Sequence, residues 1–151
     1  MTLPAPAEQG HYSKAPILEA LLEIFVTPLP PEKLATLDAL GAEIRSDYPQ
    51  KSPRMQFTAE ITTGPQAGTT TSHRNDGFIY SSVDGKQRLQ IHLSGFAFHR
   101  LTPYENWQLF RDEARRLWDL CSAAFEGAAV VRVGVRYINQ LSLPFGRDIG
   151  E

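Results

Sequence analysis

The segment 102–126 carries the strongest periodic pattern in the chain, because its apolar side chains recur at the spacing of one helix face. A helix with such a stripe must bury it against another element. Thr102 is the expected N-cap and Pro103 the first helical residue, with Glu105 completing a capping box. The expected buried stripe is Trp107, Phe110, Ala114, Leu117, Trp118, Cys121, Ala124 and Phe125.

A second amphipathic helix is expected at residues 31–48. Two prolines, Pro30 and Pro31, supply its start, and Pro49 prevents its continuation because a proline disfavours helical geometry in the residue before it. The side chains at helical spacing are Leu34, Leu37, Leu40, Ile44 and Tyr48.

Several segments alternate between apolar and polar residues, the pattern of a half-buried strand. They are residues 54–63, a hairpin at 77–99 and residues 129–143. The hairpin turns at Asp84-Gly85, a pair suited to positive φ angles. The stretch 64–77 has the composition of a loop, although its threonines also allow an extra strand at 66–76.

The second half of that hairpin changes phase. Its apolar side chains occupy odd positions up to Leu93 and even positions from Phe96. A regular strand cannot do this without an extra residue, so a β-bulge is expected at Ser94-Gly95. The bulge would place His92 and His99 on the same non-core face.

The first apolar segment, 16–26, fits a strand and a helix about equally well. A resemblance bears on this choice. The segments HYSKAPILEALLEI (11–24), GFAFHRLTPYENWQLFRDEARRLW (95–118) and VRVGVRYINQLSLP (131–144) carry it. Together they resemble a sporadically distributed family of uncharacterised bacterial and archaeal proteins, known only by a numbered family model. The resemblance implies a strand at 16–26 and a longer protein with a second half. It implies no reaction, so no catalytic residue is carried over.

The expected fold class is therefore α+β, an antiparallel β-sheet in the order β-α-β-β-β-α-β with two helices packed on one face. The 66–76 segment would add a further strand. Residues 1–13 are expected to be a flexible segment, 14–144 a single domain, and 145–151 a tail that would begin the second half.

Composition narrows the classes of partner. The chain has 151 residues, 15 Lys and Arg against 17 Asp and Glu, and no block of like charge. This argues against a nucleic-acid binder. Its one cysteine, Cys121, allows no internal disulfide. No apolar run is long enough to span a membrane and no secretory signal is recognised, so a cytoplasmic protein is expected. No cofactor or metal site is expected either.

The candidate binding residues are Glu19, Glu23, Arg132, Arg136, Asn139, His92 and His99. The two glutamates and the two arginines each lie four residues apart. If their strands are neighbours, two cross-strand ion pairs form in register. Alternatively, the arginines flank Gly134 and form an anion site.

Three of the remaining candidates have both a structural and a functional interpretation. Asn139 falls on the apolar side of its strand, where a buried amide would need a hydrogen-bonding partner or a ligand. His92 and His99 are either sheet-face histidines or residues with a metal-binding or acid–base role, with Gln90 or Glu60 nearby, although no third metal ligand is evident.

Three functional hypotheses follow. A non-catalytic protein-interaction domain, forming a homodimer or a complex through the last strand and the tail, is favoured because no acid–base pair, metal set or cofactor fingerprint is recognised. The alternative is a domain that binds a small anionic ligand in a pocket between sheet and helices, gated by residues 64–77. The third is a hydrolase that uses His92 or His99.

Overall fold

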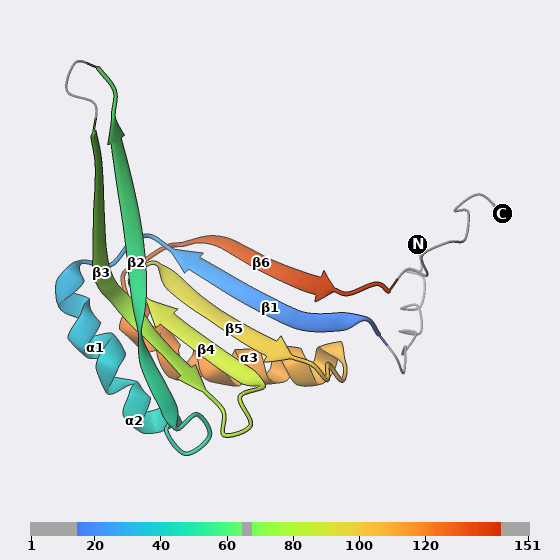
Figure 1. Cartoon of the computed structure of the whole chain (residues 1–151). Helices are drawn as coiled ribbons and strands as arrows, with labels where there is room; N and C mark the ends of the chain where they lie inside the picture. Colours follow the sequence, from blue (N-terminus) through green and yellow to red (C-terminus); the bar gives the residue numbers. More distant parts are fainter. Residues whose placement is uncertain (1–14, 65–67, 143–151) are drawn as a thin grey trace, which may run out of the picture.

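Six strands form one open antiparallel sheet in the order β2-β3-β4-β5-β1-β6, with the helices on one face (Figure 1). The structure, a computed structural model, describes residues 15–64 and 68–142. The strands are β1 (Ile17–Val26), β2 (Gln50–Thr62), β3 (Gly68–Ser81), β4 (Gln87–His92), β5 (Gly95–Leu101) and β6 (Val130–Asn139). The expected α+β class is confirmed. The expected flexible segment at 1–13 and tail at 145–151 lie outside the described residues.

The first apolar segment is a strand, as the resemblance implies, and it lies between β5 and β6 inside the sheet. Ala20 and Val26 of β1 are buried in the core. The intrinsic preference of Leu and Ala for helices is overridden here, because β1 pairs with a strand on each side.

The helix expected at 31–48 is broken into three pieces. They are η1 (Pro31–Lys33), α1 (Leu34–Ala39) and α2 (Gly41–Ile44). The break between α1 and α2 falls at Leu40, immediately before Gly41, which is a poor helix former. The hydroxyl of Tyr80 lies 2.7 Å from where a Cβ of residue 41 would stand. The expected stripe still reaches the core through Leu37, Ile44 and Tyr48.

The phase change after Leu93 is a chain reversal, so the predicted β-bulge is wrong. Residues 87–99 form two strands, β4 and β5, that pair antiparallel with His92 opposite Gly95. A two-residue turn changes the parity of the apolar positions as a bulge does. Gly95 has φ +147°, and a Cβ there would stand 2.2 Å from the Ile24 carbonyl oxygen, so β1 packs tightly against the turn. The turn divides one expected strand into β4 and β5, and the sheet therefore has six strands.

Of the segment 66–76, the described residues 68–76 join the sheet as part of β3, which pairs with β2 along its whole length. The two strands extend beyond the sheet as a protruding hairpin (Figure 1). Met55, Phe57 and Ile61 lie on this hairpin and are exposed, so the expected half-buried face of residues 54–63 is wrong. No described helix covers the hairpin, because the helices lie under the central strands (Figure 1).

The long helix α3 spans Trp107–Cys121 and continues into η2 (Ser122–Phe125). Its apolar stripe is confirmed: Phe110, Ala114, Leu117 and Cys121 are buried. Phe110 stacks on Phe98 of β5 with ring centroids 5.5 Å apart. The expected cap is wrong, because the N-cap is Asn106, whose side chain accepts a hydrogen bond of 2.9 Å from the Leu109 N–H. Glu105 pairs instead with Arg100 on β5.

The cap can be tested by substitution. Asn106→Ala should lower the free energy of unfolding by about 1 kcal/mol, because it leaves the Leu109 N–H at the helix end without its side-chain acceptor. Thr102→Ala is the control and should change it by less than about 0.5 kcal/mol. Urea denaturation measures both. A larger loss for Thr102→Ala would restore the sequence-based cap.

Candidate functional site

The sheet face turned away from the helices, called here the open face, carries a chain of polar contacts. His99 on β5 lies between Glu19 on β1 and Gln90 on β4. Its Nδ1 is 2.5 Å from Glu19 Oε1, and its Nε2 is 3.0 Å from Gln90 Nε2. A ring with its proton on Nδ1 donates to the carboxylate and accepts from the amide, so both ring nitrogens are engaged.

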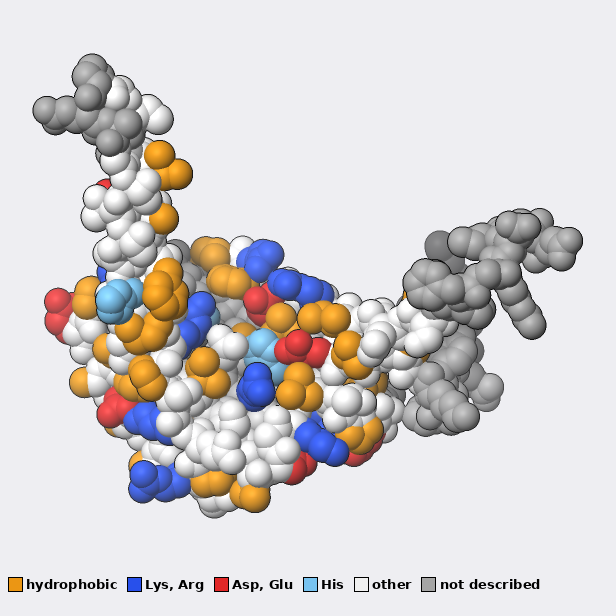
Figure 2. All heavy atoms as spheres, viewed as in Figure 1, with side chains coloured by type: hydrophobic (Ala, Val, Ile, Leu, Met, Phe, Trp, Pro, Cys, Tyr) orange, Lys and Arg blue, Asp and Glu red, His pale blue; other side chains and the backbone are white. Residues whose placement is uncertain are grey.

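The same chain continues to the far edge of the sheet. Gln90 Oε1 accepts a hydrogen bond from Arg54 Nε at 3.3 Å, and Arg54 forms an ion pair with Asp76. Asp76 lies at the β-bulge between β2 and β3 and is buried. Glu19, His99, Gln90, Asp76 and Arg54 thus form a polar row across five adjacent strands. Figure 2 shows acidic, basic and histidine side chains near the middle of this face.

His92 lies on the same face as His99, as the sequence predicts, because the β4–β5 turn preserves that relation. It is only 6% exposed, and its ring meets Phe25 edge-on at 6.4 Å. Its Nδ1 accepts a hydrogen bond from the Ser94 N–H. Burial, helped by the charge of Arg54, lowers the pKa of His92 to about 4. The ring is therefore neutral at neutral pH, which fits a packed histidine.

The two ion pairs expected between β1 and β6 do not form as predicted. The register places Glu23 opposite Gly134 and Glu19 opposite Ile138. Glu23 forms ion pairs with both arginines, which lie diagonally across from it. Its Oε2 is 3.0 Å from Arg136 Nη2 and 3.8 Å from Arg132 Nη2. Glu19 pairs with His99 instead.

The remaining candidates lie at the rim. Arg132 and Arg136 are exposed, and the Arg132 guanidinium stands 4.3 Å from the centre of the Phe25 ring. Asn139 ends β6 and is exposed, so the expected buried amide is wrong. The structure thus brings Glu19, Glu23, Arg132, Arg136 and the two histidines onto one face, while Asn139 stays apart.

The second feature is β6 itself, an edge strand with no described strand on its outer side. On the helix-side face it presents four exposed apolar side chains, called here the β6 strip. They are Val131, Val133, Val135 and Tyr137, with 61%, 62%, 44% and 39% of their surface exposed. The sequence predicts this apolar alternation, but the expected core face is uncovered. The ring of Tyr137 meets that of Tyr104 edge-on, with centroids 5.6 Å apart.

The helix side of the sheet also holds a groove of about 810 Å³ between α3, the segment after α2 and the strands β4 and β5. Aromatic and charged side chains line it together: Asp47, Tyr48, Ser82, Gln87, Phe98, Arg100, Tyr104, Glu105, Asn106, Leu109, Phe110, Asp112, Glu113 and Arg116. None of the sequence-predicted candidates is among them. Of the expected gate at 64–77, none of the described residues lines this groove.

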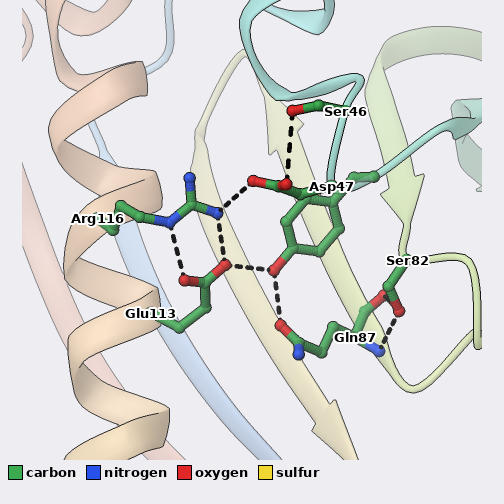
Figure 3. Close-up of polar contacts among 7 residues, drawn as sticks. Ser46, Asp47, Ser82, Gln87, Glu113 and Arg116 are labelled. Carbon is green, nitrogen blue, oxygen red and sulfur yellow. Dashed lines mark hydrogen bonds and ion pairs between the residues drawn. The ribbon is translucent and has the colours of Figure 1, made fainter.

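A hydrogen-bonded cluster of groove-lining residues ties the segment after α2 to α3 and β4 (Figure 3). The Tyr48 hydroxyl is 2.7 Å from Glu113 Oε1 and 2.7 Å from Gln87 Oε1. Burial and the hydrogen bond to Glu113 raise the pKa of Tyr48 far above its ordinary value. Burial also raises the pKa of Glu113, but hydrogen bonds from Arg116 and Tyr48 outweigh this and lower it.

Sequence reasoning missed this cluster. Glu113 and Arg116 lie three residues apart on the helix face expected to be solvated, and only that spacing hints at a pair. Tyr48 joins them from 65 residues away. Periodicity records that a side chain is buried but not which distant partner it meets.

Residues 15–64 and 68–142, which the structure describes, contain neither a metal-binding cluster nor a membrane-spanning helix. No group of three or more His, Cys, Asp or Glu side chains in them is arranged to hold a metal ion. No helix among them is long and apolar enough to cross a membrane.

No protein-family model matches the chain, and comparisons with curated proteins and with solved structures found no match.

The burial of His92 predicts a pH dependence of stability. Below about pH 6.5 the unfolded chain binds a proton at His92, which the folded chain binds only near pH 4. Above pH 6.5 His92 therefore leaves the free energy of unfolding unchanged. As the pH falls to 4, proton binding at His92 in the unfolded chain should lower the free energy of unfolding by up to ~3 kcal/mol. His92→Asn should lose less stability over this interval in urea titrations. Parallel curves for the two proteins would contradict the prediction.

Proposed function

We propose that the chain is a non-catalytic protein-interaction domain that binds along β6, either to a second copy or to another protein. The observation that supports this is the β6 strip beside an unpaired strand edge. Contiguous exposed apolar side chains next to free backbone N–H and C=O groups are the usual template for adding a strand. A cytoplasmic location remains part of the proposal.

The two edges of the sheet differ in a way that supports this choice. The other edge, β2, carries Lys51, Pro53 and a β-bulge, three devices that hinder the addition of a strand. Between Val130 and Asn139 the sequence of β6 has neither lysine nor proline. Its register with β1 shifts only near the ends of the strand. An edge of ten residues without such protection is suited to pairing.

The contacts of the polar row also favour binding over catalysis. Both nitrogens of His99 are engaged by neighbouring side chains, and His92 is buried. A hydrolase using either histidine would need a cleft beside it. Neither ring lines the groove of the helix side.

Small-molecule binding is a second candidate, favoured by the volume and aromatic lining of that groove. Arg132, Arg136 and Asn139, on which the expectation of an anionic ligand rested, do not line it. Its charged lining comprises Asp47, Glu105, Asp112 and Glu113 against Arg100 and Arg116. A ligand with an amino group fits this balance better than an anion does.

Substitution of the β6 strip tests the interaction. Val135→Glu should reduce self-association, or retention of a protein partner in co-purification from the native host, at least about tenfold, because it places a charge in the apolar contact. Val83→Glu is the matched control: Val83 is 75% exposed in the β3–β4 turn, and its substitution should have no effect. Light scattering over a concentration series and quantitative mass spectrometry provide the measurements.

Equal behaviour of the two variants would contradict the proposal, as would a wild-type protein that stays monomeric and retains no partner. Circular dichroism and thermal unfolding establish that both variants fold.

A further inference from the structure

The charges of the open face limit which partner strand β6 can accept. Arg132 and Arg136 project from it with Gly134 between them, and a side chain at Gly134 would meet nothing within 4 Å. An incoming strand must therefore avoid placing a positive charge opposite either arginine. It can also use the space over Gly134.

A second copy of β6 satisfies these conditions in one antiparallel register. A two-fold axis through Val135 places Val135 opposite itself and Val133 opposite Tyr137 of the second copy. On the open face, Arg132 lies opposite Ile138 and Gly134 opposite Arg136 of the second copy. Apolar side chains then meet across the helix-side face, and no arginine faces an arginine.

The neighbouring registers are worse. An axis through Gly134 places Arg132 against Arg136 of the second copy, and an axis through Arg136 places that residue against itself. Like charges directly opposite one another destabilise a strand pair. An axis through Val133 avoids this but shortens the pairing, because β6 begins at Val130. The Val135 register pairs nearly the whole strand.

The same register matches the glutamates of β1. Glu23 lies opposite Gly134, which would lie opposite Arg136 of the second copy. Glu19 lies opposite Ile138, which would lie opposite Arg132 of the second copy. Each pair is separated by two strand spacings, about 10 Å, which a glutamate and an arginine side chain can bridge together. Gly134 leaves the path to Glu23 open.

We infer that the partner of β6 is a second copy of this chain, bound by antiparallel β6–β6 pairing about Val135 into a continuous twelve-stranded sheet. The inference rests on the proposed function and specifies its partner. The two glutamates and the two arginines have the same four-residue spacing. In this dimer the second copy's arginines therefore lie in line with Glu23 and Glu19.

Cysteine pairing tests the register. Val135→Cys should oxidise to a covalent dimer by itself. Val133→Cys and Tyr137→Cys should each give about tenfold less alone but should cross-link when mixed, since a disulfide requires close Cβ atoms. Cys121 is fully buried, so the wild type is the background control. Non-reducing electrophoresis measures the yields.

The outcomes separate the two proposals. A dimer that cross-links most readily through Val133→Cys alone, or through none of these positions, overturns the Val135 register and leaves the interaction function standing. A monomer that loses a different protein on Val135→Glu substitution overturns the second copy as partner. A monomer that retains no partner overturns both.

Discussion

The burial of the apolar stripe of α3 against the middle of the sheet is the contact on which the rest of the molecule depends. Phe110, Ala114, Leu117 and Cys121 meet a sheet face that includes Leu89 and Phe98, and these belong to one core cluster. That contact determines which face of β4, β5 and β1 is apolar. The polar row is restricted to the opposite face as a result, because successive residues of a strand point to opposite sides.

The sequence predicted those elements whose apolar period is long and unbroken. The α3 stripe, the α1–α2 stripe and the alternation of β6 could all be read from spacing alone. The β4–β5 turn could not, because a turn and a β-bulge change the parity of Phe96 and Phe98 in the same way. The cap was misplaced because Thr102 and Pro103 form a good helix start locally, while β5 continues to Leu101 and delays the helix.

The candidate site was predictable in its members but not in its pairing. Residue types and spacing selected Glu19, Glu23, Arg132, Arg136 and the histidines, and all of them lie on one face. Their partners depend on register: a shift of two residues separates a direct Glu23–Arg136 pair from the diagonal contact found. Gln90 was considered, but Arg54 and Asp76 were missed. Arg54 begins an expected strand and Asp76 lies in the stretch 64–77, which has the composition of a loop, so their pairing could not be predicted.

The protruding β2–β3 hairpin has a thermodynamic consequence of its own. Beyond Arg54 its two strands contact mainly each other, and side chains such as Phe57 and Ile61 remain in solvent. The free energy that holds these pairs closed comes from backbone hydrogen bonds and cross-strand contacts rather than from the core. Opening should therefore become easier towards the tip, and amide exchange there should proceed without global unfolding. One sheet thus contains two levels of stability, and the length of the hairpin can change without altering the packing of α3.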